Sequence, residues 1–155
     1  MNRYQAKLVS ESLESIMEFQ RGRKDPSETL NLGKKKELME WLKQFVPLSG
    51  YKINSDWTVD VRELIIPHTY MKELPEFVQF NLCRGDVLIR DQYIESLAGF
   101  PKIVKGDFFV DGNKLEDLDG CPEEVGGDFY IRKNNKKFTI DEVKALCKVG
   151  GRIVV

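Results

Sequence analysis

The sequence contains few of the residues on which catalysis, metal binding and membrane insertion depend. His68 is the only histidine in 155 residues, and the cysteines Cys83, Cys121 and Cys147 form no CxxC pair. We therefore expect neither a zinc site nor a disulfide framework, and a reducing cytoplasm is the expected compartment. The sequence has no P-loop and no GxGxxG motif. It also has no apolar run long enough to span a bilayer and no secretory signal, so no membrane association is expected.

An excess of charge of either sign is also absent. The chain has 24 basic and 25 acidic residues, which give a net charge of -1. Domains that bind nucleic acid usually show a basic excess, so a nucleic-acid partner is not favoured. The basic runs 21–24 and Lys34–Lys36 are interpreted as solvated helix ends, although lysines and arginines at this density can also contact phosphates.

A catalytic set of residues cannot be assembled from the spacing. His68 lies in an irregular segment, and no nucleophile with a nearby base is evident. The carboxylate pairs Glu123–Glu124 and Asp117–Asp119 fall on predicted turns, where solvated acids are common. We therefore predict that the protein is not an enzyme and uses no metal or cofactor.

The first 50 residues are predicted to be helical. Val9, Leu13, Ile16 and Met17 follow a helical spacing. Residues 25–28 read Asp-Pro-Ser-Glu, a capping box that predicts a short helix ending at Gly33. A second helix is predicted from Lys34, with one apolar face formed by Leu38, Trp41, Leu42 and Phe45.

From Tyr51 onward the sequence repeats itself. Gly85, Gly106 and Gly127 are 21 residues apart, and so are the pairs Leu97 and Leu118, Pro101 and Pro122, and Val104 and Val125. Two close copies cover 85–104 and 106–125, a looser one precedes them at 62–78, and an altered one follows at 127–149. A repeat of this length predicts stacked coils that bury a shared core. The sequence thus predicts an α+β chain, with a helical segment at 1–50 and a β-solenoid at 51–155.

Each coil is predicted to begin with a strand that has an inner and an outer face. Phe108 and Val110 would point into the core and Phe109 outward. Asn113, at the turn that leaves the strand, would hydrogen-bond backbone groups of neighbouring coils. Leu115 and other apolar residues of the return segment would complete the core, namely Leu118 and Val125.

This order of residues resembles the leucine-rich repeat of the short bacterial type. The pattern φ-x-φ-x-x-N-x-L-x-x-L followed by P-x-x-V is specific over 87–125, where Gln92 replaces one asparagine. In the last copy Lys136 stands where leucine is expected. A capping box at Thr139–Glu142 there predicts a helix that, with a strand at 152–155, would form a C-terminal cap.

More closely, the chain resembles leucine-rich-repeat-like proteins encoded by large tailed bacteriophages. The similar stretches read LDGCPEEVGGDFY, EFQRGRKDPSETLNLG (18–33) and LPEFVQFN (74–81). The resemblance implies a fold and a phage origin more than an activity.

The outer face of the strands is the predicted partner-binding site. In the 21-residue register one outward column is apolar, and charged columns flank it. Protein interfaces often show such an apolar row with a charged rim. Local packing, or cover by the N-terminal helices, would explain the same residues. The candidate contacts with a partner are Leu88, Arg90, Phe109, Asp111, Tyr130 and Arg132.

A second column consists of Asp86, Asp107 and Asp128. Three carboxylates in a row could gather Ca²⁺. Because each of these residues follows a glycine at the start of a strand, hydrogen bonds to turn amides are the simpler interpretation.

The function expected from these features is that of a non-enzymatic protein-interaction module. The phage resemblance implies a host protein as partner, a defence or regulatory protein that is inhibited or redirected in the host cytoplasm. Two alternatives stay open: a small-ligand or nucleotide-binding sponge protein that uses the aromatic residues with Arg90 and Arg132, and a virion-associated assembly protein that docks through 18–33. An open solenoid end would also offer a surface for homo-oligomerisation.

Overall fold

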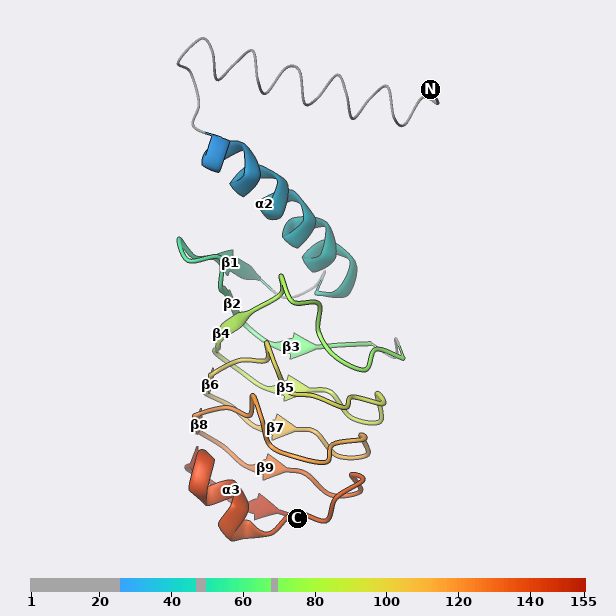
Figure 1. Cartoon of the computed structure of the whole chain (residues 1–155). Helices are drawn as coiled ribbons and strands as arrows, with labels where there is room; N and C mark the ends of the chain where they lie inside the picture. The colour runs from blue at the N-terminus through green and yellow to red at the C-terminus, as the bar shows by residue number, and fades with distance from the viewer. Residues whose placement is uncertain (1–25, 47–49, 68–69) are drawn as a thin grey trace. The chain divides into compact units, whose positions relative to one another are not determined.

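The computed structural model describes residues 26–46, 50–67 and 70–155, with side chains described from residue 31 (Figure 1). Met1–Glu40 and Trp41–Val155 form two compact units. The predicted helix around Leu13, the basic run 21–24, the capping residue Asp25 and His68 lie outside the described residues.

The first described element is one helix, α2, which runs from Pro26 to Phe45. Gly33 lies inside α2, so the prediction of two helices separated at Gly33 is wrong. A glycine within a helix costs about 1 kcal/mol relative to alanine. The helix tolerates Gly33 because Leu32 and Lys34–Lys36 on either side are good helix formers. No proline follows until Pro47. The lysines of that run are exposed.

The last turn of α2 belongs to the second unit and packs against its first coil. Trp41 is almost buried and Leu42 is fully buried. The ring centroid of Trp41 lies 6.3 Å from that of Phe80 and 4.8 Å from that of Phe45. These contacts seal the core of the first coil with aromatic and aliphatic side chains, as a terminal element of a repeat protein must do.

The rest of the second unit is a β-solenoid in which each coil gives one strand to each of two sheets (Figure 1). The six-stranded sheet has the order β1-β2-β4-β6-β8-β10, and the five-stranded sheet has the order β11-β9-β7-β5-β3. All neighbours are parallel except β1 and β2. The six-stranded sheet consists of β1 (Tyr51–Ile53), β2 (Val59–Val61), β4 (Phe80–Cys83), β6 (Ile103–Val104), β8 (Glu124–Val125) and β10 (Lys148–Val149). The five-stranded sheet consists of β3 (Leu64–Ile65), β5 (Val87–Leu88), β7 (Phe108–Phe109), β9 (Phe129–Tyr130) and β11 (Ile153–Val154).

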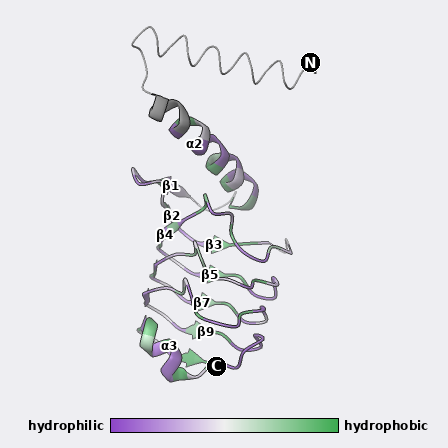
Figure 2. Cartoon of the chain, in the orientation of Figure 1, coloured by the Kyte–Doolittle hydropathy of each residue, from purple (hydrophilic) through white to green (hydrophobic). Residues whose placement is uncertain are grey.

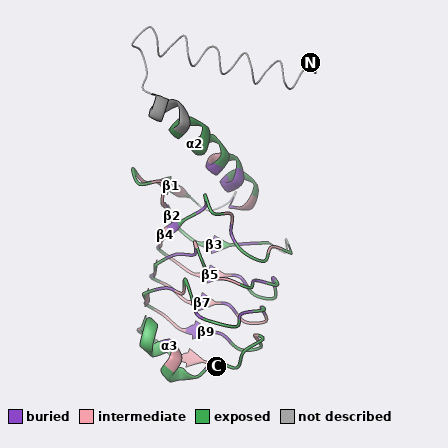
Figure 3. Ribbon diagram, in the orientation of Figure 1, coloured by how far each residue is buried: buried purple, intermediate pink, exposed green. Residues whose placement is uncertain are grey.

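The strand register confirms the 21-residue repeat. Phe108 pairs with Val87 on one side and with Phe129 on the other. Phe108 and Phe129 are fully buried, and their rings meet edge to face with centroids 5.0 Å apart. Figure 2 shows the strands of the five-stranded sheet largely in green, the hydrophobic colour, and Figure 3 shows that exposed positions gather at the coil corners. The sheet that contains β6, β8 and β10 was not predicted.

Asn113 connects neighbouring coils, as predicted. Its side chain is 2% exposed. Oδ1 accepts hydrogen bonds from the backbone N–H groups of Gln92 (3.0 Å) and Ile94 (3.1 Å). Nδ2 donates to the carbonyl oxygens of Ile89 (2.6 Å) and Val110 (3.0 Å). One side chain thus satisfies four backbone groups at a turn that the sheets cannot reach.

The predicted C-terminal cap is present as helix α3 (Ile140–Leu146) and strand β11. Thr139 accepts a hydrogen bond from the Glu142 backbone N–H, and the Glu142 carboxylate accepts one from the Thr139 backbone N–H, so the capping box is complete. Val143 and Cys147 are buried, whereas Leu146 is 56% exposed. The altered last repeat therefore closes the core with one side of a short helix.

Candidate functional site

The outer face of the five-stranded sheet carries a continuous row of apolar side chains, which we call the apolar stripe. Each member pairs with the next across the parallel strands, in the predicted register. Ile65 is 50% exposed, and the members that follow are half-buried. The apolar stripe consists of Ile65, Leu88, Phe109, Tyr130 and Val154.

The two aromatic members of the stripe form a rigid stack. The rings of Phe109 and Tyr130 lie 4.6 Å apart at an interplanar angle of 17°. The guanidinium of Arg90 lies over Phe109, 3.9 Å from the ring centroid. The same guanidinium lies 5.8 Å from the Tyr130 centroid, so Arg90 contacts the stack beside both rings. Such contacts each contribute about 0.5–1.5 kcal/mol, so the local-packing interpretation of these residues is correct, yet the stack still reaches solvent.

Arg90, Asp111 and Arg132 lie beside the stripe and form the arginine–aspartate cluster. Arg90 Nε lies 3.5 Å from Asp111 Oδ2, and Arg132 Nε lies 3.7 Å from Asp111 Oδ1. Asp111 Oδ1 also accepts a hydrogen bond from the Arg132 backbone N–H at 2.8 Å. The arginine side chains are 46% and 53% exposed. Because one carboxylate faces two guanidinium groups, the cluster has a surplus positive charge and free donors for an anionic group of a partner.

The aspartate column on the other side of the stripe has a structural role. Asp86 Oδ1 accepts the backbone N–H of Asp107 at 2.8 Å, and Asp107 Oδ1 accepts that of Asp128 at 2.7 Å. Asp128 Oδ1 in turn accepts the backbone N–H of Arg152 at 2.7 Å. These bonds to turn amides match the simpler interpretation of the column. Within the described ranges, no group of three or more metal-binding side chains is arranged to hold an ion.

Asp128, at the end of this column, is an acid with a strongly lowered pKa. Hydrogen bonds from Arg152 lower this pKa from 3.8 to about 2, and the bond from its backbone N–H has a larger effect than the one from its side chain. The guanidinium Nη2 lies 2.8 Å from Asp128 Oδ2. The Tyr130 hydroxyl donates to the same oxygen at 3.0 Å, and this bond raises the pKa of Tyr130. Asp128 therefore fixes the edge of the aromatic stack.

We expect the Asp128 carboxyl to titrate near pH 2 in a carbon-detected NMR titration. Because its folded pKa is below the ordinary value of 3.8, its contribution to stability is fully present above about pH 4 and is lost as the pH falls toward about 2. Arg152→Gln should raise the pKa of Asp128 only part of the way, since the backbone N–H remains. A wild-type pKa at the ordinary value would contradict this arrangement.

The cysteines are partly or fully buried, and members of the paired acids have local contacts. Burial raises the pKa of Cys83 and Cys121 to about 11 and that of Cys147 to about 12, so the thiols stay protonated near neutral pH. The Asp117 carboxylate accepts the Asp119 backbone N–H, and Glu124 pairs with Lys105 at 3.2 Å. These acids therefore have local structural partners.

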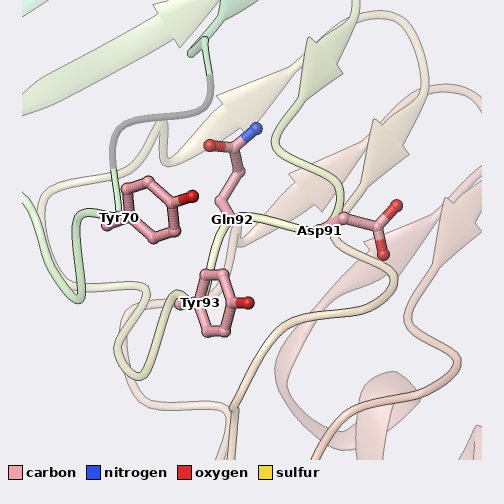
Figure 4. A pocket seen from close by; sticks show the side chains of 4 residues that line it. All are labelled: Tyr70, Asp91, Gln92 and Tyr93. Carbon is pink, nitrogen blue, oxygen red and sulfur yellow. The ribbon is translucent and has the colours of Figure 1, made fainter.

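The structure also shows a cavity that sequence reasoning missed. It has a volume of about 220 Å³ and is lined by Tyr70, Asp91, Gln92 and Tyr93 (Figure 4). The two tyrosine rings stack with centroids 5.6 Å apart. The repeat itself indicated that this turn is unusual, because this coil has Gln92 and Tyr93 at the positions where the next coil has Asn113 and Lys114.

Comparisons with known proteins do not assign this surface. No protein-family model matches the chain, and neither curated proteins nor solved structures give a significant match. In the described part of the chain, no helix has both the length and the apolar character needed to cross a membrane.

Proposed function

We propose that the protein is a non-enzymatic interaction module that binds a partner protein through the apolar stripe and the arginine–aspartate cluster. The observation that supports this most directly is the stack of Arg90, Phe109 and Tyr130 on the outer face of a regular sheet. Arginine and aromatic residues are enriched among the residues that dominate binding energies. Because the stack is held in one conformation by its own contacts, less side-chain entropy is lost on binding.

A protein partner fits this surface better than a small planar ligand. The Phe109 ring is crowded by Tyr130, whose centroid is 4.6 Å away, and by the Arg90 guanidinium, which is 3.9 Å from the Phe109 centroid and 5.8 Å from that of Tyr130. A base or another flat ring that stacked where Arg90 lies would have to displace its guanidinium. A protein surface can instead lie across the exposed edges of the stripe and offer an acidic group to Arg90 and Arg132.

The partner in this proposal is a host defence or regulatory protein, and the site of action is the host cytoplasm. This part rests on the resemblance to phage-encoded leucine-rich-repeat-like proteins. The inward phenylalanines and the asparagine turn support a stacked solenoid, which is the coarser part of that resemblance.

Phe109→Ala combined with Tyr130→Ala should abolish partner capture while the fold is retained. Two aromatic residues at the centre of an interface commonly contribute enough that their loss weakens binding at least about 100-fold. The tagged full chain is used for affinity capture from lysate of phage-infected host cells, and a stoichiometric partner is quantified by mass spectrometry. Circular dichroism verifies folding.

A matched control removes an apolar pair from the outer face of the other sheet. Leu82 and Ile103 are paired across β4 and β6 and are half-buried like Phe109 and Tyr130. Leu82→Ala combined with Ile103→Ala should leave capture unchanged. If the stripe variant captures the partner as well as the wild type does, the proposed surface is wrong.

A further inference from the structure

The turn that carries Tyr93 departs from the corresponding turns of the next coils. Asp91, Gly112 and Lys133 occupy equivalent positions and all have positive φ, at 53°, 71° and 58°. The turn at Tyr93 differs because Tyr93 itself (66°) also has positive φ, as does the nearby Tyr70 (53°). A side chain in this conformation costs about 1 kcal/mol or more. Such strain is concentrated at functional sites, which directs attention to the two tyrosines.

The strained backbone presents two stacked aromatic rings to solvent. Tyr70 is 80% exposed and Tyr93 is 51% exposed. Their rings are 5.6 Å apart at an interplanar angle of 30°. Figure 4 shows the Tyr70 and Tyr93 rings near one another, whereas the Asp91 carboxylate points away from them. At this exposure Tyr70 has an open ring surface.

An exposed lysine is present on each of the next two coils. Lys114 lies one coil beyond Tyr93, with Nζ 5.9 Å from the Tyr93 ring centroid. Lys133 lies one coil further, at the position equivalent to Gly112. Both lysines are exposed, and neither forms an ion pair with any residue that the structure describes. We call Tyr70, Tyr93, Lys114 and Lys133 the turn ridge.

We propose that the turn ridge binds a nucleotide, with the base stacked on Tyr70 and Tyr93 and the phosphates at Lys114 and Lys133. Aromatic platforms joined to basic side chains are the combination that binds unpaired nucleotides. Successive coils are roughly 5 Å apart, so Lys114 lies about one coil spacing from the Tyr93 ring, and Lys133 lies on the coil after that. A nucleotide has a planar ring and an anionic group separated by such a distance.

The size of the cavity limits what it can hold. Its volume of about 220 Å³ is below the range of roughly 300–1,000 Å³ typical of sites for drug-sized ligands. One base fits such a cavity, while the sugar and phosphates extend along the ridge. This binding site is separate from the apolar stripe and does not depend on the function proposed above.

Calorimetric titration of the full chain with adenosine, AMP, ATP and a ten-residue oligothymidylate tests this proposal. We expect ATP to bind more tightly than adenosine. Tyr70→Asn combined with Tyr93→Asn should weaken binding of every probe roughly 10- to 100-fold. Asparagine is chosen because it tolerates positive φ. The phenylalanine double variant, which keeps both rings, should bind like the wild type.

Lys114→Gln combined with Lys133→Asn should remove the advantage of ATP over adenosine, whereas Lys105→Gln on another coil corner should not. Tighter binding of the oligonucleotide than of ATP would identify single-stranded nucleic acid as the source of the nucleotide, and the reverse order would identify a free nucleotide. The proposal is overturned if no probe binds at about 1 mM, or if the asparagine double variant binds as well as the wild type.

Discussion

Asn113→Leu should lower the free energy of unfolding by about 3–5 kcal/mol, because buried backbone groups left without partners each cost about 1–3 kcal/mol. Leucine has the same heavy-atom branching as asparagine, but it can form none of these hydrogen bonds. Asn113 satisfies four backbone groups from two coils and is 2% exposed. Urea denaturation followed by circular dichroism measures the change.

Two other asparagines provide graded controls. Asn134 occupies the equivalent position one coil later, where it is only half-buried and bonds to backbone groups at 2.9–3.2 Å. Asn134→Leu should cost less than Asn113→Leu. Asn135 is exposed, and Asn135→Leu should change stability by less than about 0.5 kcal/mol. Equal costs at Asn113 and Asn135 would contradict the role assigned to the turn.

Phe108→Ala should cost about 3–5 kcal/mol, the usual loss for a fully buried phenylalanine. Its ring packs against Phe129 at 5.0 Å and is 0% exposed. A domain of this size has a total stability of roughly 5–15 kcal/mol, so this one substitution would remove a large part of it. Thermal and urea unfolding of the full chain would show the effect.

The adjacent residue is the matched control for this prediction. Phe109 lies in the same strand but on the outer face, and it is half-buried. Phe109→Ala should therefore cost clearly less than Phe108→Ala, while it should impair partner capture more. If both substitutions destabilise the protein equally, the inner and outer faces of β7 are not distinguished as the structure indicates.

The helical segment shows where local signals mislead. A glycine just after Leu32 looks like a helix end, yet α2 continues through Gly33 to Phe45. The cost of one internal glycine is about 1 kcal/mol, which is less than the cost of ending one helix and nucleating another. Propensity at a single position could not reveal this, because the outcome depends on the residues on both sides.

The sequence by itself determined the repeat, its register and the two faces of each strand. A period of 21 residues with phenylalanine, asparagine and leucine at fixed positions leaves one way to stack the coils, and the pairing of Phe108 with Phe129 follows it. The capping box at Thr139 was equally local, since its two hydrogen bonds involve residues three apart.

Only the tertiary structure decided which surface side chains contact one another. The repeat places Arg90, Phe109 and Tyr130 in adjacent columns, but side-chain torsions determine that Arg90 lies over Phe109. The cavity beside Tyr93 also depends on Tyr70, which is 23 residues earlier and outside the exact period. Long-range packing of this kind leaves no periodic trace in the chain, because it results from where irregular turns bring their side chains together in space.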